Sequence, residues 1–171
     1  MDHIRASIEA AVGYLSEHPD EARYTDSAAT ARLEEGLRFR VGGPSGEELV
    51  TDMPAAVGGD GSAPSPGWFL RASVASCVGS LVVMEAARAG LTLAGLEVVV
   101  DSESDDRGIL GMDPSVPAGP LRMRVAVSGE VGDGERPAFE EVVRTAVVRC
   151  PVSDAVRRAV EMTLEVRAPA G

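Results

Sequence analysis

The sequence is poor in the residues on which several common functional classes depend. Basic residues are scarce, because 16 Lys and Arg stand against 27 Asp and Glu, which gives a formal net charge of −11. Such a surface repels phosphate backbones and anionic lipids, so we expect neither a nucleic-acid partner nor a membrane partner. The first residues show no basic stretch followed by an apolar core and a cleavage site, and we therefore expect a cytoplasmic protein.

Cysteine is also sparse, with only Cys77 and Cys150 in 171 residues. Neither belongs to a CxxC pair, so the sequence gives no support to a zinc ribbon or a thioredoxin-like motif. His3 and His18 lie far from both thiols in the sequence and match no zinc-ligand spacing, so we expect no metal and no other cofactor. In a reducing compartment, two such cysteines are redox-active, metal-binding or inert rather than a permanent crosslink.

Long uncharged runs are missing as well, although one stretch is strongly apolar. Residues 66–90 read PGWFLRASVASCVGSLVVMEAARAG, with a Ser-Pro start signal before them and a glycine as the stop. Because Arg71, Glu85 and Arg88 interrupt this stretch, it lacks the run of about 18 uncharged residues typical of a membrane span. A helix that is apolar on all sides belongs in a core, so we predict that the rest of the chain packs around it.

The other segments change between helical and strand periodicity without a regular strand–helix repeat. The predicted elements are a helix at 2–18, a hairpin at 29–41, a strand at 48–52, the central helix, strands at 96–103 and 121–129 around a loop, helices at 137–149 and 151–159, and a closing strand at 162–166. This order predicts an α+β fold, with residues 1–23 as a helical extension and 24–171 as the folded domain.

The chemistry that the sequence can offer rests on the two thiols and on cations near them. Cys77 lies inside the predicted central helix, and Cys150 ends the next long helix. A cysteine on an apolar helix is most often a small buried hydrophobe, whereas a reactive thiol needs a neighbouring cation that lowers its pKa. Arg38 and Arg40 share one face of the predicted hairpin and are candidates for that cation; the alternative is that they form a solvated face.

Two longer motifs together resemble a known family. One is the glycine- and proline-bearing loop that enters the central helix, TDMPAAVGGDGSAPSPGWFLRASVASC, ending at Cys77, and the other is Cys150 followed by Pro-Val-Ser. With the order of elements between Tyr24 and Val166, they resemble the OsmC/Ohr superfamily, which comprises osmotically inducible protein C-like and organic hydroperoxide resistance proteins. The resemblance implies an N-terminal sheet, the long central helix carrying a cysteine, and then two strands, a helix and a strand.

The resemblance also implies a thiol-dependent peroxidase on an intertwined homodimer, with its sites at the subunit interface. Cys77 corresponds to the thiolate that attacks the distal peroxide oxygen and becomes a sulfenic acid. Cys150 corresponds to the thiol that condenses with it to a disulfide, which an external dithiol such as a dihydrolipoyl protein reduces. The family's thiolate-stabilising arginine corresponds to Arg38 or Arg40, and the sequence leaves both open.

One position departs from the family pattern. The organic-hydroperoxide branch has a glutamate after the proline that starts the central helix, and this glutamate pairs with the arginine; here the residue is Gly67. We therefore expect Asp52 or Glu48 to anchor the arginine, or the arginine to swing freely. The expected function is a stress-response peroxidase acting on organic hydroperoxides. The alternative is a non-catalytic member that binds a small hydrophobic ligand at the dimer interface.

Overall fold

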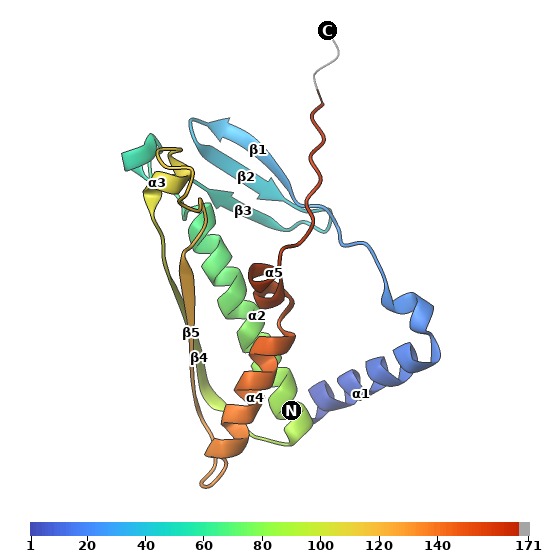
Figure 1. The fold of residues 1–171 in the computed structure, drawn as a ribbon. Coiled ribbons are helices and arrows are strands. Elements are labelled where there is room, and N and C mark those ends of the chain that lie inside the picture. The colour runs from blue at the N-terminus through green and yellow to red at the C-terminus, as the bar shows by residue number, and fades with distance from the viewer. Residues whose placement is uncertain (168–171) are drawn as a thin grey trace.

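A computed structural model describes residues 1–167 of the chain and shows the α+β architecture that the sequence predicts (Figure 1). Its elements in chain order are α1 (Asp2–Glu17), η1 (Pro19–Ala22), β1 (Thr30–Glu35), β2 (Arg38–Gly42), β3 (Glu48–Thr51), η2 (Ala55–Val57), α2 (Pro66–Ala89), β4 (Ala94–Glu103), α3 (Asp106–Ile109), β5 (Arg122–Glu130), α4 (Arg136–Arg149) and α5 (Pro151–Arg157). The strands form two separate antiparallel sheets, one ordered β1-β2-β3 and the other β4-β5.

Helix α2 has the bounds that its start and stop signals predict. The Ser65 hydroxyl accepts a hydrogen bond from the backbone N–H of Trp68 at 3.2 Å, and Pro66 occupies the first turn, where no N–H is needed. Gly90 ends the helix at φ 72°, a left-handed conformation that glycine adopts without a Cβ clash. By length and composition α2 is apolar enough to cross a membrane, a test that the core helix of a soluble protein also passes.

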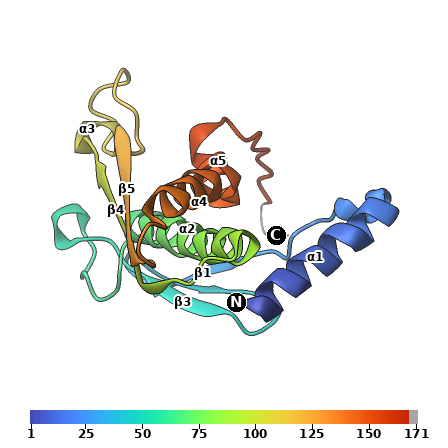
Figure 2. The same ribbon diagram turned by 90° about the horizontal axis from the view of Figure 1, so that it is seen from below.

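The β4-β5 sheet and the helices α1, α4 and α5 pack around α2. The β4-β5 sheet lies along one side of the helix and α4 along another, and α1 and α5 also contact it (Figures 1 and 2). The buried core follows these contacts and consists of Val74, Val78, Val82, Ala86, Leu91, Phe139, Val142, Ala146 and Cys150. Strand β4 turns Val98 and Val100 towards this core and leaves Val99 half exposed, as the period of two requires.

The N-terminal sheet separates apolar from basic side chains, as the alternation of the hairpin predicts. Its register pairs Leu33 with Phe39, and Val41 with Leu49, on one face, while Arg40 stands on the other. The apolar face is poorly covered, because the sheet has no extensive contact with any helix in residues 1–167 and the Leu33 side chain is 61% exposed. An exposed apolar face of this kind is typical of a surface that packs against another molecule.

The connection from β3 to α2 is held by a buried carboxylate. Asp52 is 2% exposed and accepts hydrogen bonds from the backbone N–H groups of Met53 at 2.7 Å and Ser62 at 2.9 Å, and from the Ser62 hydroxyl at 2.8 Å. The bonds from Ser62 are the largest of the causes that hold the pKa of Asp52 below its usual value. The carboxylate thereby fixes the glycine-rich loop that delivers the chain to the start of α2.

Two expectations about secondary structure need correction. The predicted loop after β4 contains a short helix, α3, which Asp105 caps by accepting a hydrogen bond from the N–H of Arg107. The predicted closing strand at 162–166 is wrong, because this segment pairs with neither sheet. A strand needs a neighbouring strand for its backbone hydrogen bonds, and this segment does not lie against an edge of either sheet. Its apolar side chains stay in solvent, with Met162 92% and Leu164 89% exposed.

Replacing Asp52 tests the role of this carboxylate. We expect Asp52→Asn to lower the thermal midpoint at pH 7, because the amide presents donors to groups that are themselves donors. The folded pKa is lowered, so the carboxylate's contribution is complete above the unfolded pKa of about 3.9 and is lost as the pH falls through the folded value. The difference from wild type, measured by circular dichroism, should therefore shrink below about pH 4. Asp60→Asn, at an exposed position in the same loop, is the control and should have little effect at any pH.

Candidate active site

The structure brings the two cysteines together from elements distant in the sequence. Cys77 lies in the middle of α2 and is half-buried, whereas Cys150 lies at the junction of α4 and α5 and is fully buried, at 0% exposure. Both are free thiols. Because α2 packs against α4 and against α5, the C-terminus of α4 meets the central helix, as a disulfide-forming pair requires.

The two thiols interact with each other, and their pKa values shift in opposite directions. Burial raises the pKa of the Cys77 thiol, and the hydrogen bond with Cys150 raises it further. Burial also raises the pKa of Cys150, but the neighbouring Ser153 hydroxyl, the Cys77 thiol and backbone N–H groups outweigh it, so the pKa of Cys150 is lowered overall. In the reduced pair, therefore, Cys150 ionises first and Cys77 keeps its proton.

An ion pair fixes the end of α4 on which Cys150 depends. Glu85 is the single acidic residue of α2 and is 9% exposed, and its carboxylate accepts a hydrogen bond from Nη1 of Arg149 at 2.9 Å. Arg88, one turn further along α2, lies 3.5 Å from the same carboxylate oxygen. Since Arg149 immediately precedes Cys150, this pair ties the last turn of α4 to the helix that carries Cys77.

Arg38 and Arg40 lie on the N-terminal sheet and share a carboxylate there. Arg38 donates from Nε to Glu34 at 2.9 Å and Arg40 from Nε to the other oxygen of Glu34 at 2.6 Å. These bonds, that from Arg40 first, lower the pKa of Glu34. Among residues 1–167, no hydrogen bond or ion pair joins either arginine to a cysteine of the same chain.

The anchors expected in place of the family glutamate are both in position. Glu48 pairs with Nη1 of Arg40. Asp52 reaches Arg38 indirectly, because the Ser62 hydroxyl accepts from Nη1 of Arg38 at 2.7 Å and donates to Asp52. An ideal Cβ on Gly67 would have Nη1 of Arg71 as its nearest side-chain neighbour, together with Ser65, at 3.9 Å. A glutamate at this position would therefore meet Arg71 before the arginines of the sheet.

Sequence reasoning missed several residues of the site. The sequence did not single out Glu34, which lies at the register shift between Leu33 and Glu35 and contacts both arginines there. Ser153 was treated as part of a motif without a role of its own. The signal for Glu85 was present, since a single carboxylate in a mostly apolar helix needs a cationic or hydrogen-bonding partner. The identity of that partner, Arg149, depends on tertiary packing.

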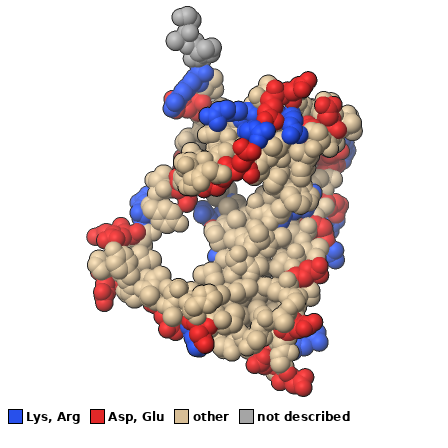
Figure 3. All heavy atoms as spheres, turned by 180° about the vertical axis from the view of Figure 1, so that it is seen from behind, with Lys and Arg blue, Asp and Glu red and all other residues tan. Residues whose placement is uncertain are grey.

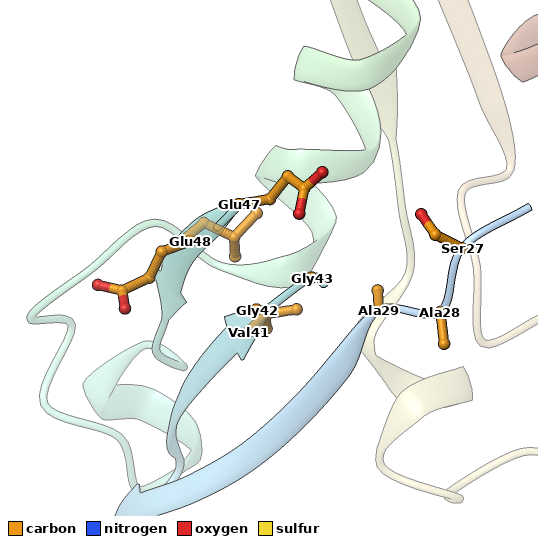
Figure 4. A pocket seen from close by; sticks show the side chains of 9 residues that line it. Ser27, Ala28, Ala29, Val41, Gly42, Gly43, Glu47 and Glu48 are labelled. Carbon is orange, nitrogen blue, oxygen red and sulfur yellow. The ribbon is translucent and has the colours of Figure 1, made fainter. Parts of the chain in front are cut away.

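A pocket on the N-terminal sheet lies apart from the thiols. It has a volume of about 250 Å³ and lies between the segment that leads into β1 and the turn between β2 and β3 (Figure 4). Its lining includes Ser27, Val41 and Leu49, while Glu47 and Glu48 point away from each other; it contains neither cysteine nor arginine. Within the part of the chain that the structure describes, no group of three His, Cys, Asp or Glu residues is placed to hold a metal ion.

The sequence was compared with models of known protein families and with curated proteins. A family model described as OsmC-like protein matches residues 59–165, which is more than half of the chain. No curated protein sequence matches significantly.

Solved structures match the fold at low sequence identity. An OsmC-like protein from Mycoplasma pneumoniae is 15% identical, with a TM-score of 0.65 over 80% of this chain and 91% of that one. An organic hydroperoxide resistance protein OsmC from Legionella pneumophila is 23% identical, with a TM-score of 0.58 over 79% and 91%. The organic hydroperoxide resistance protein OhrB of Bacillus subtilis is 22% identical, with a TM-score of 0.51 over 84% and 98%. At these identities the likeness establishes the fold.

The Glu85–Arg149 pair can be tested against a surface pair on the same helix. Arg149→Met should lower the free energy of unfolding by about 1–3 kcal/mol, because the buried carboxylate loses its closest donor. Arg144→Met removes an exposed ion pair with Glu140 and should cost less than about 0.5 kcal/mol. Urea titration of both variants measures the difference, and equal losses would contradict a special role for Arg149.

Proposed function

Because this chain belongs to the OsmC-like protein family, we propose that it is a two-cysteine peroxidase that reduces organic hydroperoxides. The observation that carries the proposal is the meeting of a half-exposed thiol, Cys77, with a fully buried and more acidic thiol, Cys150. The names of two matching structures, which are organic hydroperoxide resistance proteins, support the same chemistry.

The pair can carry a balanced peroxidase cycle. Cys150, as thiolate, accepts the Cys77 proton, and the Cys77 sulfur attacks the distal oxygen of the hydroperoxide. The O–O bond breaks, Cys77 becomes a sulfenic acid, and the alkoxide takes the proton from Cys150 and leaves as an alcohol. The Cys150 thiolate then attacks the Cys77 sulfur and releases hydroxide, which takes up a proton from solvent to become water; this balances the proton that Cys150 lost to solvent when it ionised. An external dithiol supplies the two electrons and two protons that restore both thiols.

The surroundings of Cys77 favour an alkyl substituent on the peroxide. Cys77 lies on the most apolar helix of the chain and packs against the hydrophobic core. An alkyl group gains from leaving water for such a surface, whereas hydrogen peroxide has no apolar part to contribute. We therefore propose an organic hydroperoxide as the substrate.

The proposed peroxidase acts as a homodimer. In one chain, only 17% of the most apolar 18-residue part of α2 is buried. The apolar face of the N-terminal sheet is also uncovered. The space-filling view shows an opening between the arm formed by α1 and the body, bordered mainly by uncharged side chains (Figure 3). A second copy is the proposed cover for these surfaces.

A dimer also gives Arg38 and Arg40 a role. They make no hydrogen bond or ion pair with the cysteines of their own chain within the described residues, yet Glu34, Glu48 and Ser62 hold their guanidinium groups in fixed positions. We propose that one of them faces the thiol pair of the second copy. There its charge would lower the pKa of Cys77 when the substrate binds.

Thiol counting tests the cycle. With one equivalent of cumene hydroperoxide, wild type should lose two thiols and form an intrachain disulfide between Cys77 and Cys150. Cys150→Ser should stop at a sulfenic acid on Cys77, trapped by dimedone and located by mass spectrometry. Cys77→Ser should leave Cys150 unreacted at the same dose, because the buried thiol is out of reach. Wild-type peroxide consumption by both single variants would contradict the proposal and favour ligand binding.

The dimer is tested by sedimentation at micromolar concentration, where we expect two chains per particle. Leu33→Ser, on the uncovered face of β1, should weaken the association at least about tenfold, since burying a leucine contributes about 1.5–3 kcal/mol. Arg136→Ser changes an exposed side chain in the first turn of α4, away from the N-terminal sheet, and should leave the association nearly unchanged. A wild-type monomer, or equal effects of the two substitutions, would refute this interface.

A further inference from the structure

Ser153 is placed to control the sulfur of Cys150. It lies in the first turn of α5 and is 7% exposed. Its backbone N–H donates to Sγ of Cys150 at 3.4 Å. Its hydroxyl is buried and, among the residues that the structure describes, makes no hydrogen bond, to sulfur or to any other acceptor. A buried hydroxyl without a partner is unfavourable, and the sulfur of Cys150 is the acceptor beside it.

The two sulfurs differ in access as well as in hydrogen bonding. Cys77 is partly exposed, whereas Cys150 is closed off completely by the core. A thiol arriving from solvent therefore reaches the sulfur of Cys77. Negative charge that develops on the sulfur of Cys150 meets the N–H of Ser153, which already donates to it, and attracts the neighbouring hydroxyl, which has no other acceptor to give up.

We propose that Ser153 is a positioning residue that gives the disulfide a direction of reduction: the external dithiol attacks Cys77, and Cys150 leaves as a thiolate held by Ser153. In its physiological setting this inference rests on the proposed peroxidase cycle. Thiol–disulfide exchange is faster when the leaving thiol is more acidic, so donors on one sulfur alone select which sulfur leaves.

The electrons and protons of the step balance. One thiolate of the dithiol forms a bond with the Cys77 sulfur, the Cys77–Cys150 bond breaks, and its electron pair stays on Cys150. The second thiol of the reductant, after losing its proton, attacks the reductant sulfur of the mixed disulfide and releases Cys77. The reductant ends as a disulfide, and its two protons end on the protein thiols.

The test begins with the full chain oxidised by diamide, so that it does not depend on any reaction with peroxide. Excess 2-mercaptoethanol, rapid acid quenching and peptide mapping locate the first mixed disulfide. In wild type we expect it on Cys77 in nearly all molecules. A mixed disulfide mainly on Cys150, or divided equally between the two, would overturn the inference without the need for any variant.

Variants of Ser153 supply the second measurement. We expect Ser153→Ala to slow reduction by dithiothreitol about threefold or more, because Cys150 becomes a poorer leaving group, and to reduce the share of the mixed disulfide on Cys77. Ser153→Thr keeps the hydroxyl and should stay within about twofold of wild type. Equal slowing in both variants would indicate a packing role only, and no slowing in Ser153→Ala would also overturn the inference. If peroxide leaves both thiols intact while these results hold, the proposed peroxidase fails and the directed disulfide stands.

Discussion

The packing of the end of α4 against α2 is the constraint on which the rest of the site depends. Cys150 lies in the same core as Val78 and Val82 of the central helix, so its position is set by the most closely packed part of the chain. The ion pair between Glu85 and Arg149 fixes the same turn from outside the core. A thiol held in this way cannot move to meet its partner, and the geometry of α2 must therefore bring Cys77 to it.

This rigidity explains why the two thiols differ in character although they are neighbours. Hydrogen-bond donors surround Cys150, while Cys77 has a partner thiol and a half-open surface. The more acidic thiol is thus the inaccessible one, and the accessible thiol keeps its proton until a neighbour accepts it. Such a division protects the buried thiolate from oxidants and leaves the first reaction to the exposed sulfur.

Local signals predicted most of the fold, because caps, turns and periodicity act within a few residues. The bounds of α2, the hairpin faces and the helix that ends at Cys150 all follow from such patterns. The carboxylate shared by Arg38 and Arg40 and the partner of Glu85 did not follow, because both depend on which surfaces meet in three dimensions. The segment at 162–166 shows the limit most clearly, since its alternation is typical of a strand but it pairs with no strand among residues 1–167 of its own chain.

The segment at 162–166 and the N-terminal sheet both expose apolar side chains that nothing in the described part of the same chain covers. The sheet has an apolar face without a cover, and the segment has alternating apolar side chains, Met162, Leu164 and Val166, each more than 80% exposed. Extended backbone also has unpaired N–H and C=O groups, which an edge strand can satisfy. A single chain leaves the apolar face of the sheet uncovered and the segment unpaired. Two copies can cover both surfaces at once and can bring the arginines of one chain towards the thiols of the other. Assembly and chemistry would then depend on the same surfaces.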